Sequence, residues 1–151
     1  MRIHIGSDHA GLELKAELVK HLSSKGHDVT DHGPHEYDAL DDYPDFCIPA
    51  AEAVANDPFS IGIVLGGSGN GEQIAANKVN GIRAALAWSI ETARLAKEHN
   101  NANVVAVGGR MHEISFVKEI IDAFISQPFS NDERHVRRIK KISDFENKSC
   151  C

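Results

Sequence analysis

Residues 60–78 read SIGIVLGGSGNGEQIAANK, the most informative stretch of the chain. Residues 61–65 form a short apolar run, which predicts a strand buried on both faces of a parallel sheet. Four glycines follow within residues 66–71, and a helical pattern begins at Glu72. Glycine lets a backbone approach a ligand closely, and successive N–H groups before a helix favour an anion. The stretch therefore predicts a strand, an anion-binding loop and a helix that begins with a carboxylate.

Established glycine-rich motifs do not match this loop. Residues 66–71 contain no G-x-x-x-x-G-K-[ST] and no G-x-G-x-x-G spacing, which argues against the common nucleotide-binding loops. The residues around Ser68 do not form the G-x-S-x-G of a hydrolase elbow either. A tight strand-to-helix connection without a ligand remains the alternative, although such a turn needs only one or two glycines.

The rest of the chain repeats the alternation of strand and helix. Apolar or alternating runs predict five strands, at residues 2–7, 27–31, 61–65, 81–88 and 103–107. Helical spacing predicts helices at residues 12–25, 46–55 (with Pro49 in its first turn), 72–79, 89–100, 114–125 and 132–146. Together they predict an open parallel α/β sheet with helices on both faces, in one domain over residues 1–147 with a short polar tail at 148–151.

Composition sets limits on the function. A formal net charge of −6 in 151 residues argues against binding to nucleic acid or to an anionic membrane. No apolar run approaches a membrane span, and the first strand begins directly after Met1, so we expect no signal peptide. Three cysteines, Cys47 and the terminal pair Cys150-Cys151, form no disulfide framework. We expect a cytoplasmic protein.

Polar residues follow three of the predicted strands. Asp8 and His9 come after the first, the glycine loop after the third, and Gly-Gly-Arg, ending at Arg110, after the fifth. Because ligands of such sheets bind at the carboxyl ends of the strands, we expect these groups to converge. Asp8 could cap the next helix or act as an acid or base on substrate hydroxyls, and His9 could donate to a phosphate.

Two further clusters leave alternatives open. His99 and Asn100 end a helix, where a solvated histidine is the plain interpretation. Arg134 and Arg138 lie one helical turn apart in a basic run, residues 134–141, that is either a solvated face or an anion site. The histidines show no metal-ligand spacing, so we expect no catalytic metal.

Five motifs together resemble the type B ribose-5-phosphate isomerases, whose family also contains galactose- and allose-6-phosphate isomerases. They are G-S-D-H-A-G at 6–11, G-G-S-G-N-G-E at 66–72, I-A-A-N-K at 74–78, E-H-N-N-A-N at 98–103 and G-G-R at 108–110. The resemblance covers nearly the whole chain. It implies a Rossmann-like three-layer α/β/α sandwich and a homodimer or tetramer with shared active sites. It implies no metal or nucleotide cofactor.

The resemblance also implies a reaction and roles for individual residues. Ribose 5-phosphate and ribulose 5-phosphate would interconvert through a cis-enediolate, in the pentose phosphate pathway of carbohydrate metabolism. One branch of the family has a cysteine base where this chain has Gly66, and the other has a glutamate at Glu72. The implied catalytic residues are Glu72 as general base, Ser68, Asp8 and His99. The implied substrate and phosphate ligands are His9, Gly67, Gly69, Asn70, Gly71, Asn100, Arg110, Arg134 and Arg138.

Several points stay open in the sequence. A non-catalytic module that binds a sugar phosphate or nucleotide is one alternative, although the joint presence of Glu72, Ser68, Asp8 and His99 speaks against it. An isomerase for a six-carbon sugar phosphate is another. The sequence also leaves the pKa of Glu72 undecided, because the helix N-terminus lowers it and burial raises it.

Overall fold

The computed structural model describes residues 1–148, so most of the expected tail, with Cys150 and Cys151, lies outside the described residues. Five parallel strands form one sheet in the order β2-β1-β3-β5-β4. The strands are β1 (Arg2–Ser7), β2 (Asp28–Asp31), β3 (Ser60–Gly66), β4 (Ala84–Leu86) and β5 (Val104–Gly108). The helices are α1 (Leu12–Ser24), preceded by the 3-10 turn η1 (His9–Gly11), α2 (Pro44–Asn56), α3 (Asn70–Ala76), α4 (Ile90–Asn100), α5 (Ile114–Ser126) and α6 (Glu133–Lys148).

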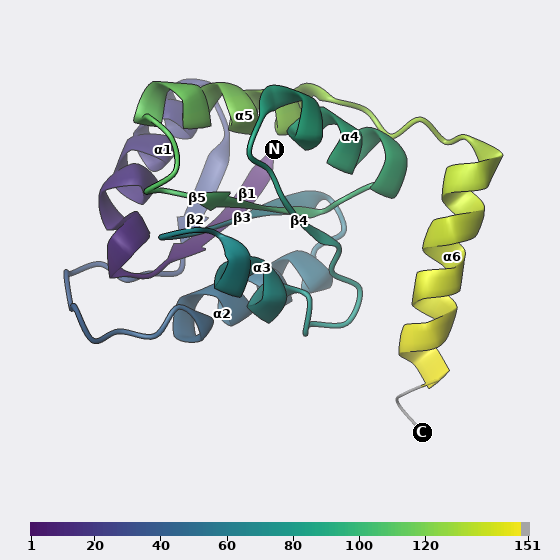
Figure 1. The fold of residues 1–151 in the computed structure, drawn as a ribbon, viewed down its shortest axis with the longest axis horizontal. Coiled ribbons are helices and arrows are strands. Elements are labelled where there is room, and N and C mark those ends of the chain that lie inside the picture. The colour runs from purple at the N-terminus through teal and green to yellow at the C-terminus, as the bar shows by residue number, and fades with distance from the viewer. Residues whose placement is uncertain (149–151) are drawn as a thin grey trace.

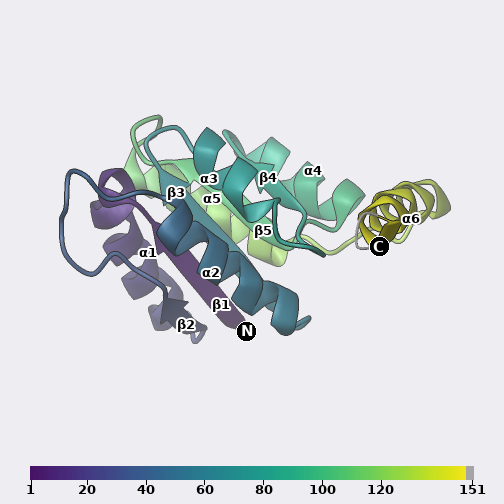
Figure 2. The ribbon, with the colours of Figure 1, turned by 90° about the horizontal axis from the view of Figure 1, so that it is seen from below.

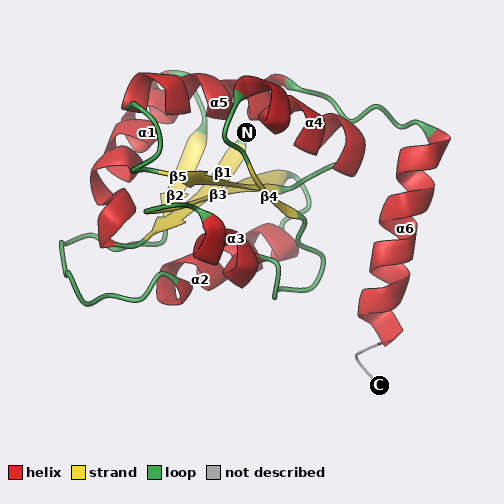
Figure 3. Cartoon of the chain, viewed as in Figure 1, coloured by secondary structure: helices red, strands yellow, loops and turns green. Residues whose placement is uncertain are grey.

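Helices cover the sheet on both faces, as the sequence predicts. α1, α4 and α5 lie on one face, and α2 and α3 lie on the other (Figures 1 and 3). Each face has its own apolar cluster, one around Ile3, Ile5 and Ile63, and one around Val64 and Val104. Every residue of β3 is buried, which explains its continuous apolar run. The predicted α/β/α sandwich is confirmed.

The central position of β3 brings the ends of three strands together. β3 pairs with β1 on one side and with β5 on the other. The register places Ser7 beside Leu65 and Gly66 beside Gly108. The loops that follow β1, β3 and β5 therefore start side by side at the carboxyl edge of the sheet.

The last helix stands apart from the sandwich. Figure 1 shows α6 beside the body, reached by an extended connection from α5, and Figure 2 shows the same separation from below. Three of its apolar side chains are exposed, Val136 at 46%, Ile142 at 50% and Phe145 at 72%. Exposed apolar surface of this kind is typical of a helix face that contacts another molecule.

Most boundaries differ from the sequence prediction by one to three residues, and three of these differences have a local structural reason. α3 begins at Asn70 rather than Glu72, because Gly69 takes a left-handed conformation (φ 81°) as its N-cap. α2 begins with Pro44 in its first turn, so Pro49 lies inside the helix. β4 covers only residues 84–86 of the expected 81–88, since the Arg83 N–H donates to the Asn103 side chain at 2.8 Å instead of to the ladder.

No described helix has the length and apolar character needed to span a membrane.

Candidate active site

A cavity of about 580 Å³ opens at the carboxyl edge of the sheet. The loops after β1, β3 and β5 all contribute to it, as expected from the strand order. The lining contains seven of the thirteen predicted site residues, Asp8, His9, Gly67, Ser68, Gly71, Glu72 and Arg110. Ala10, Tyr43 and Met111 complete it.

Glu72 is held in the first turn of α3 with its side chain folded back toward the glycine loop. The residue is only 4% exposed, and its Oε2 is buried without a hydrogen-bond partner among the described residues. A Cβ on Gly66 would overlap the Glu72 carboxylate. A side chain at position 66 would therefore displace the Glu72 carboxylate from the position that it has here.

The sequence leaves the pKa of Glu72 undecided, and in the structure the effect of burial is the stronger one. Burial raises the pKa of Glu72, and the nearby charge of Asp8 adds to the increase. The N–H groups of Glu72 itself and of Gly69 oppose it without cancelling it. A carboxylate with a raised pKa and a free oxygen is well suited to accept a proton.

Free hydrogen-bond donors line the same cavity as this carboxylate. The backbone N–H groups of Gly67, Ser68 and Gly71 have no partner within residues 1–148. The Ser68 Oγ accepts from the backbone N–H of Asn70 at 3.3 Å and from its side-chain amide at 3.2 Å. The serine hydroxyl can therefore donate its own proton to a ligand. Such an array can stabilise an oxyanion beside the base.

Arg110 reaches the cavity because the β5 loop is tied to the glycine loop. The Gly109 N–H donates to the Gly66 carbonyl at 2.7 Å, and the Arg110 N–H donates to the Gly67 carbonyl at 3.1 Å. These two bonds continue the β3–β5 pairing beyond the sheet. They place one guanidinium, suited to bidentate binding of a phosphate, at the mouth of the site.

Asp8 caps η1, which is one of the two roles that the sequence allows. Its Oδ1 accepts from the N–H groups of Ala10 at 2.9 Å and Gly11 at 3.2 Å. Among the described residues, Asp8, His9 and Asp41 are one group whose atoms, within 4.8 Å of one another, are placed to ligate a metal ion. His9 and Asp41 are already hydrogen-bonded to each other at 2.6 Å, an arrangement that needs no ion.

Four predicted site residues lie elsewhere. α4 runs back across the sheet, so its end, with His99 and Asn100, lies at the amino edge of the strands. Five residues of β5 separate the two edges, roughly 15 Å at about 3.3 Å per residue. The His99 ring packs on the ring of His135 in α6, with centroids 4.4 Å apart, near Arg134. The end of α4 therefore meets α6, and we call the predicted site residues of these two segments the second cluster, which is remote from Glu72 in the same chain: His99, Asn100, Arg134 and Arg138.

Gly69 and Asn70 do not line the cavity either. Gly69 is buried at the N-cap of α3, and Asn70 is exposed beside Ser68. Gly69 packs closely against Gly108 of β5, and the Asn70 side chain donates to the Ser68 hydroxyl, so both support the shape of the loop without lining the cavity.

Tyr43 is a site residue that the sequence reasoning missed. A Cβ on Gly71 would come within 2.6 Å of the Tyr43 ring, so ring and loop are in close contact. Tyr43 precedes α2 and does not belong to the pattern of apolar residues that predicts this helix. Its place before Pro44, at the end of the acidic loop, is the only hint that the sequence gives.

Cys47 lies behind the site and does not line it. Its side chain is completely buried in α2, and burial raises the pKa of the thiol, with further contributions from the charges of Glu72 and Asp8. A neutral buried thiol is not a nucleophile.

A family model described as Ribose/Galactose Isomerase matches residues 3–142. The chain belongs to this family. Ribose-5-phosphate isomerase B of Mycolicibacterium paratuberculosis is 58% identical over 146 residues, which are 97% of this chain and 92% of that protein. The galactose-6-phosphate isomerase subunit LacB of Clostridium acetobutylicum is 42% identical over 145 residues, 96% of this chain and 83% of that protein.

The fold agrees with solved structures of this isomerase family. The crystal structure of ribose-5-phosphate isomerase B from Mycoplasma genitalium with bound ribulose-5-phosphate matches with a TM-score of 0.94 at 44% identity. The match covers 97% of this chain and 96% of that chain. The predicted resemblance to the type B ribose-5-phosphate isomerases is confirmed.

Proposed function

We propose that this protein interconverts ribose 5-phosphate and ribulose 5-phosphate, with Glu72 as the general base. The observation that carries the proposal is the buried Glu72 carboxylate. Its Oε2 has no partner within residues 1–148, and the residue lines the same cavity as the free N–H groups of the glycine loop. Relatives at 58% and 44% identity that are named ribose-5-phosphate isomerase B support the choice of reaction.

In the proposed mechanism, Glu72 removes the proton from C2 of the open-chain aldose. The electrons of the C–H bond form the C1–C2 double bond, and the carbonyl oxygen on C1 becomes an oxyanion. The free N–H groups and the Ser68 hydroxyl stabilise this cis-enediolate. A proton passes from the oxygen on C2 to the oxygen on C1, and Glu72 returns its proton to C1, which yields the ketose.

In the proposed mechanism, the residues of the second cluster take part in binding the phosphate and in opening the sugar ring. His9 and Arg110 face the cavity in the same chain, whereas His99, Arg134 and Arg138 lie at the opposite edge of the sheet. We propose that a second copy of the chain brings its cluster to this cavity. The exposed apolar surface of α6 supports such an assembly, because burial between two copies would remove it from water. His99 and Asp8 would then assist ring opening, and the two arginines would complete the phosphate site.

An activity assay distinguishes the candidate substrates. The 42% identity to a galactose-6-phosphate isomerase subunit makes a six-carbon phosphate the second candidate. We expect kcat/KM for ribose 5-phosphate to exceed that for allose 6-phosphate and galactose 6-phosphate by at least ~10-fold. A preference for either six-carbon sugar would contradict the proposed substrate, and no turnover of any of the three would favour the non-catalytic binding module.

A further inference from the structure

Asp41 holds His9 by two hydrogen bonds to a single carboxylate oxygen. Its Oδ1 lies 3.0 Å from the backbone nitrogen of His9 and 2.6 Å from the Nδ1 of the imidazole ring. Thirty-two positions separate the two residues along the chain. The carboxylate thus fixes both the backbone and the ring of a residue that lines the cavity.

This contact is shielded from water. The Asp41 side chain is 8% exposed and that of His9 is 22% exposed. The second oxygen of Asp41, Oδ2, is buried without a partner within residues 1–148. The edge of the His9 ring also contacts the Tyr37 ring, with centroids 5.8 Å apart. A shielded, charge-assisted hydrogen bond restricts the ring more strongly than a solvated one.

The loop that carries Asp41 is anchored where it leaves the sheet. Lys15, which is only 1% exposed, donates from Nζ to the Asp31 Oδ1 and to the Pro34 carbonyl, each at 2.6 Å. The Ser7 N–H donates to the Gly33 carbonyl at 3.0 Å. The beginning of the loop is therefore fixed on β1 and α1, and its two bonds to His9 fix the loop again at Asp41.

The chemistry of the contact determines which ring nitrogen is available. A carboxylate only accepts hydrogen bonds, so the proton in this pair lies on the His9 Nδ1. No described group bonds to Nε2 of the same ring, which leaves this nitrogen for a ligand. We propose that Asp41 is a positioning residue that fixes the His9 ring through Nδ1, so that Nε2, which donates a proton of its own when both ring nitrogens are protonated, binds the substrate phosphate. The role of His9 in this inference rests on the proposed function.

Kinetics of Asp41→Asn test the inference, with Asp38→Asn as the matched control. Asp38 lies in the same loop, is exposed, and accepts only from the Leu40 N–H at 2.9 Å, so both variants remove the same charge. We expect Asp41→Asn to raise KM for ribose 5-phosphate on the order of 10-fold and to change kcat much less, since a phosphate ligand binds ground state and transition state alike. Asp38→Asn should leave both constants unchanged.

A double variant separates positioning from a purely structural role. If Asp41 acts through His9, Asp41→Asn should have no further effect on KM in a His9→Ala background. An additive effect would mean that Asp41 supports the loop independently, and it would overturn the inference. An unchanged KM in the single variant, or an equal effect of Asp38→Asn, would overturn it as well. Thermal unfolding of each variant shows whether the fold is retained.

Imidazole ¹⁵N NMR tests the pairing without any activity. We expect the wild-type His9 ring to carry its proton on Nδ1 and this preference to be lost in Asp41→Ala, which removes the acceptor altogether. An unprotonated Nδ1 in the wild type would overturn the inference even if the protein is an active isomerase. Conversely, a wild type that carries the expected tautomer but turns over no sugar phosphate would refute the proposed function alone.

Discussion

At the scale of single residues, Glu72 combines two properties that a base for proton abstraction from carbon needs. It is buried with a free oxygen, and burial raises its pKa. Glu72→Gln keeps the size and one hydrogen-bonding oxygen but accepts no proton, so we expect kcat to fall by at least ~100-fold. Glu91→Gln, at an exposed position of α4, should leave kcat unchanged. Near-normal turnover of Glu72→Gln would contradict the assignment.

The raised pKa of Glu72 also predicts how activity and stability depend on pH. The acidic limb of kcat/KM should titrate above 4.5, the ordinary value of the group, because only the ionised form accepts a proton. The folded state binds this proton more tightly than the unfolded state, so the contribution to stability falls as pH rises from 4.5 through the folded pKa. At pH 7 to 8, Glu72→Gln should therefore unfold at the same or a higher temperature. A clearly lower unfolding temperature there would contradict the burial argument.

Arg138 and Lys140 test whether the basic run of α6 contains a specific phosphate ligand. Arg138 has no ion pair among the described residues, whereas the Lys140 Nζ pairs with Asp144 at 2.7 Å within the helix. A guanidinium bound to a phosphate dianion is worth roughly 1.5–3 kcal/mol, so Arg138→Ala should raise KM about 10- to 100-fold. Lys140→Ala should not change KM. Equal effects of the two variants would indicate only a diffuse positive field.

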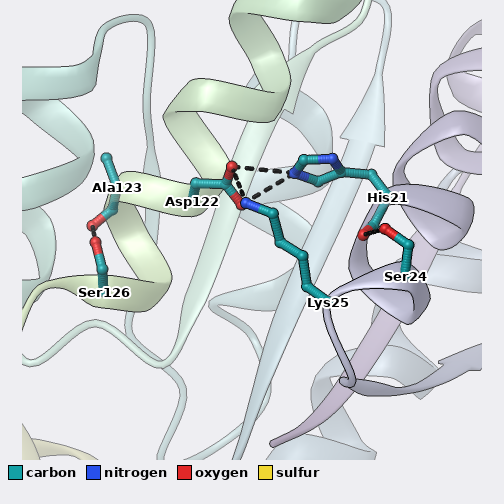
Figure 4. A network of polar contacts seen from close by, with 6 residues as sticks. All are labelled: His21, Ser24, Lys25, Asp122, Ala123 and Ser126. Atoms are coloured by element: carbon teal, nitrogen blue, oxygen red, sulfur yellow. Dashed lines mark hydrogen bonds and ion pairs between the residues drawn. The ribbon is translucent and has the colours of Figure 1, made fainter.

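At the scale of elements, a surface network joins α1 to α5 far from the cavity. Asp122 accepts from Lys25 at 2.6 Å, and both of its oxygens lie 3.0 Å from the His21 Nε2 (Figure 4). The pKa of Asp122 is lowered, because its bonds to Lys25 and His21 outweigh its burial. Its contribution to stability is therefore present at neutral pH and is lost as pH falls through the folded pKa, below 3.8.

We expect Asp122→Asn to reduce the free energy of unfolding by about 1 kcal/mol at pH 7, with unchanged kcat/KM. Urea unfolding at pH 7 and at pH 3 measures the difference, which should shrink at the lower pH. Glu119→Gln, at an exposed position of the same helix, should have little effect at either pH. A loss for Asp122→Asn that is as large at pH 3 as at pH 7 would contradict the ion-pair explanation.

The spacing of apolar residues was sufficient to predict the elements that pack into the core through apolar side chains, such as β3 and α5. It failed where a contact across the chain or a left-handed backbone conformation sets the boundary. β4 is shortened because Asn103 takes the N–H of Arg83, and α3 starts early because Gly69 turns left-handed. The contacts of Tyr43 with Gly71 depend on the path of a polar loop. The spacing of apolar residues predicts helices and strands but not the path of such a loop.

At the scale of the whole molecule, strand order explains how much of the site the sequence predicts. The loops after β1, β3 and β5 converge because these strands are neighbours, and the ends of parallel strands share an edge. Because α4 connects two parallel strands, its end lies at the opposite edge of the sheet, where β5 begins. The resemblance of the motifs predicts that His99 and Arg138 belong to the same site as Glu72. In a single chain these residues lie far from Glu72. The proposed assembly of two copies accounts for this separation.

Mixing two inactive variants tests whether the active site combines Glu72 of one copy with His99 of another. Glu72→Gln and His99→Ala proteins are combined in equal amounts, and subunit exchange is verified by a mass or affinity label. Half of the dimers should be mixed, and each of these has one site with both native residues. We therefore predict recovery of about one quarter of the wild-type activity. A fully exchanged mixture that stays as inactive as its parents would place both residues in one chain and contradict the account.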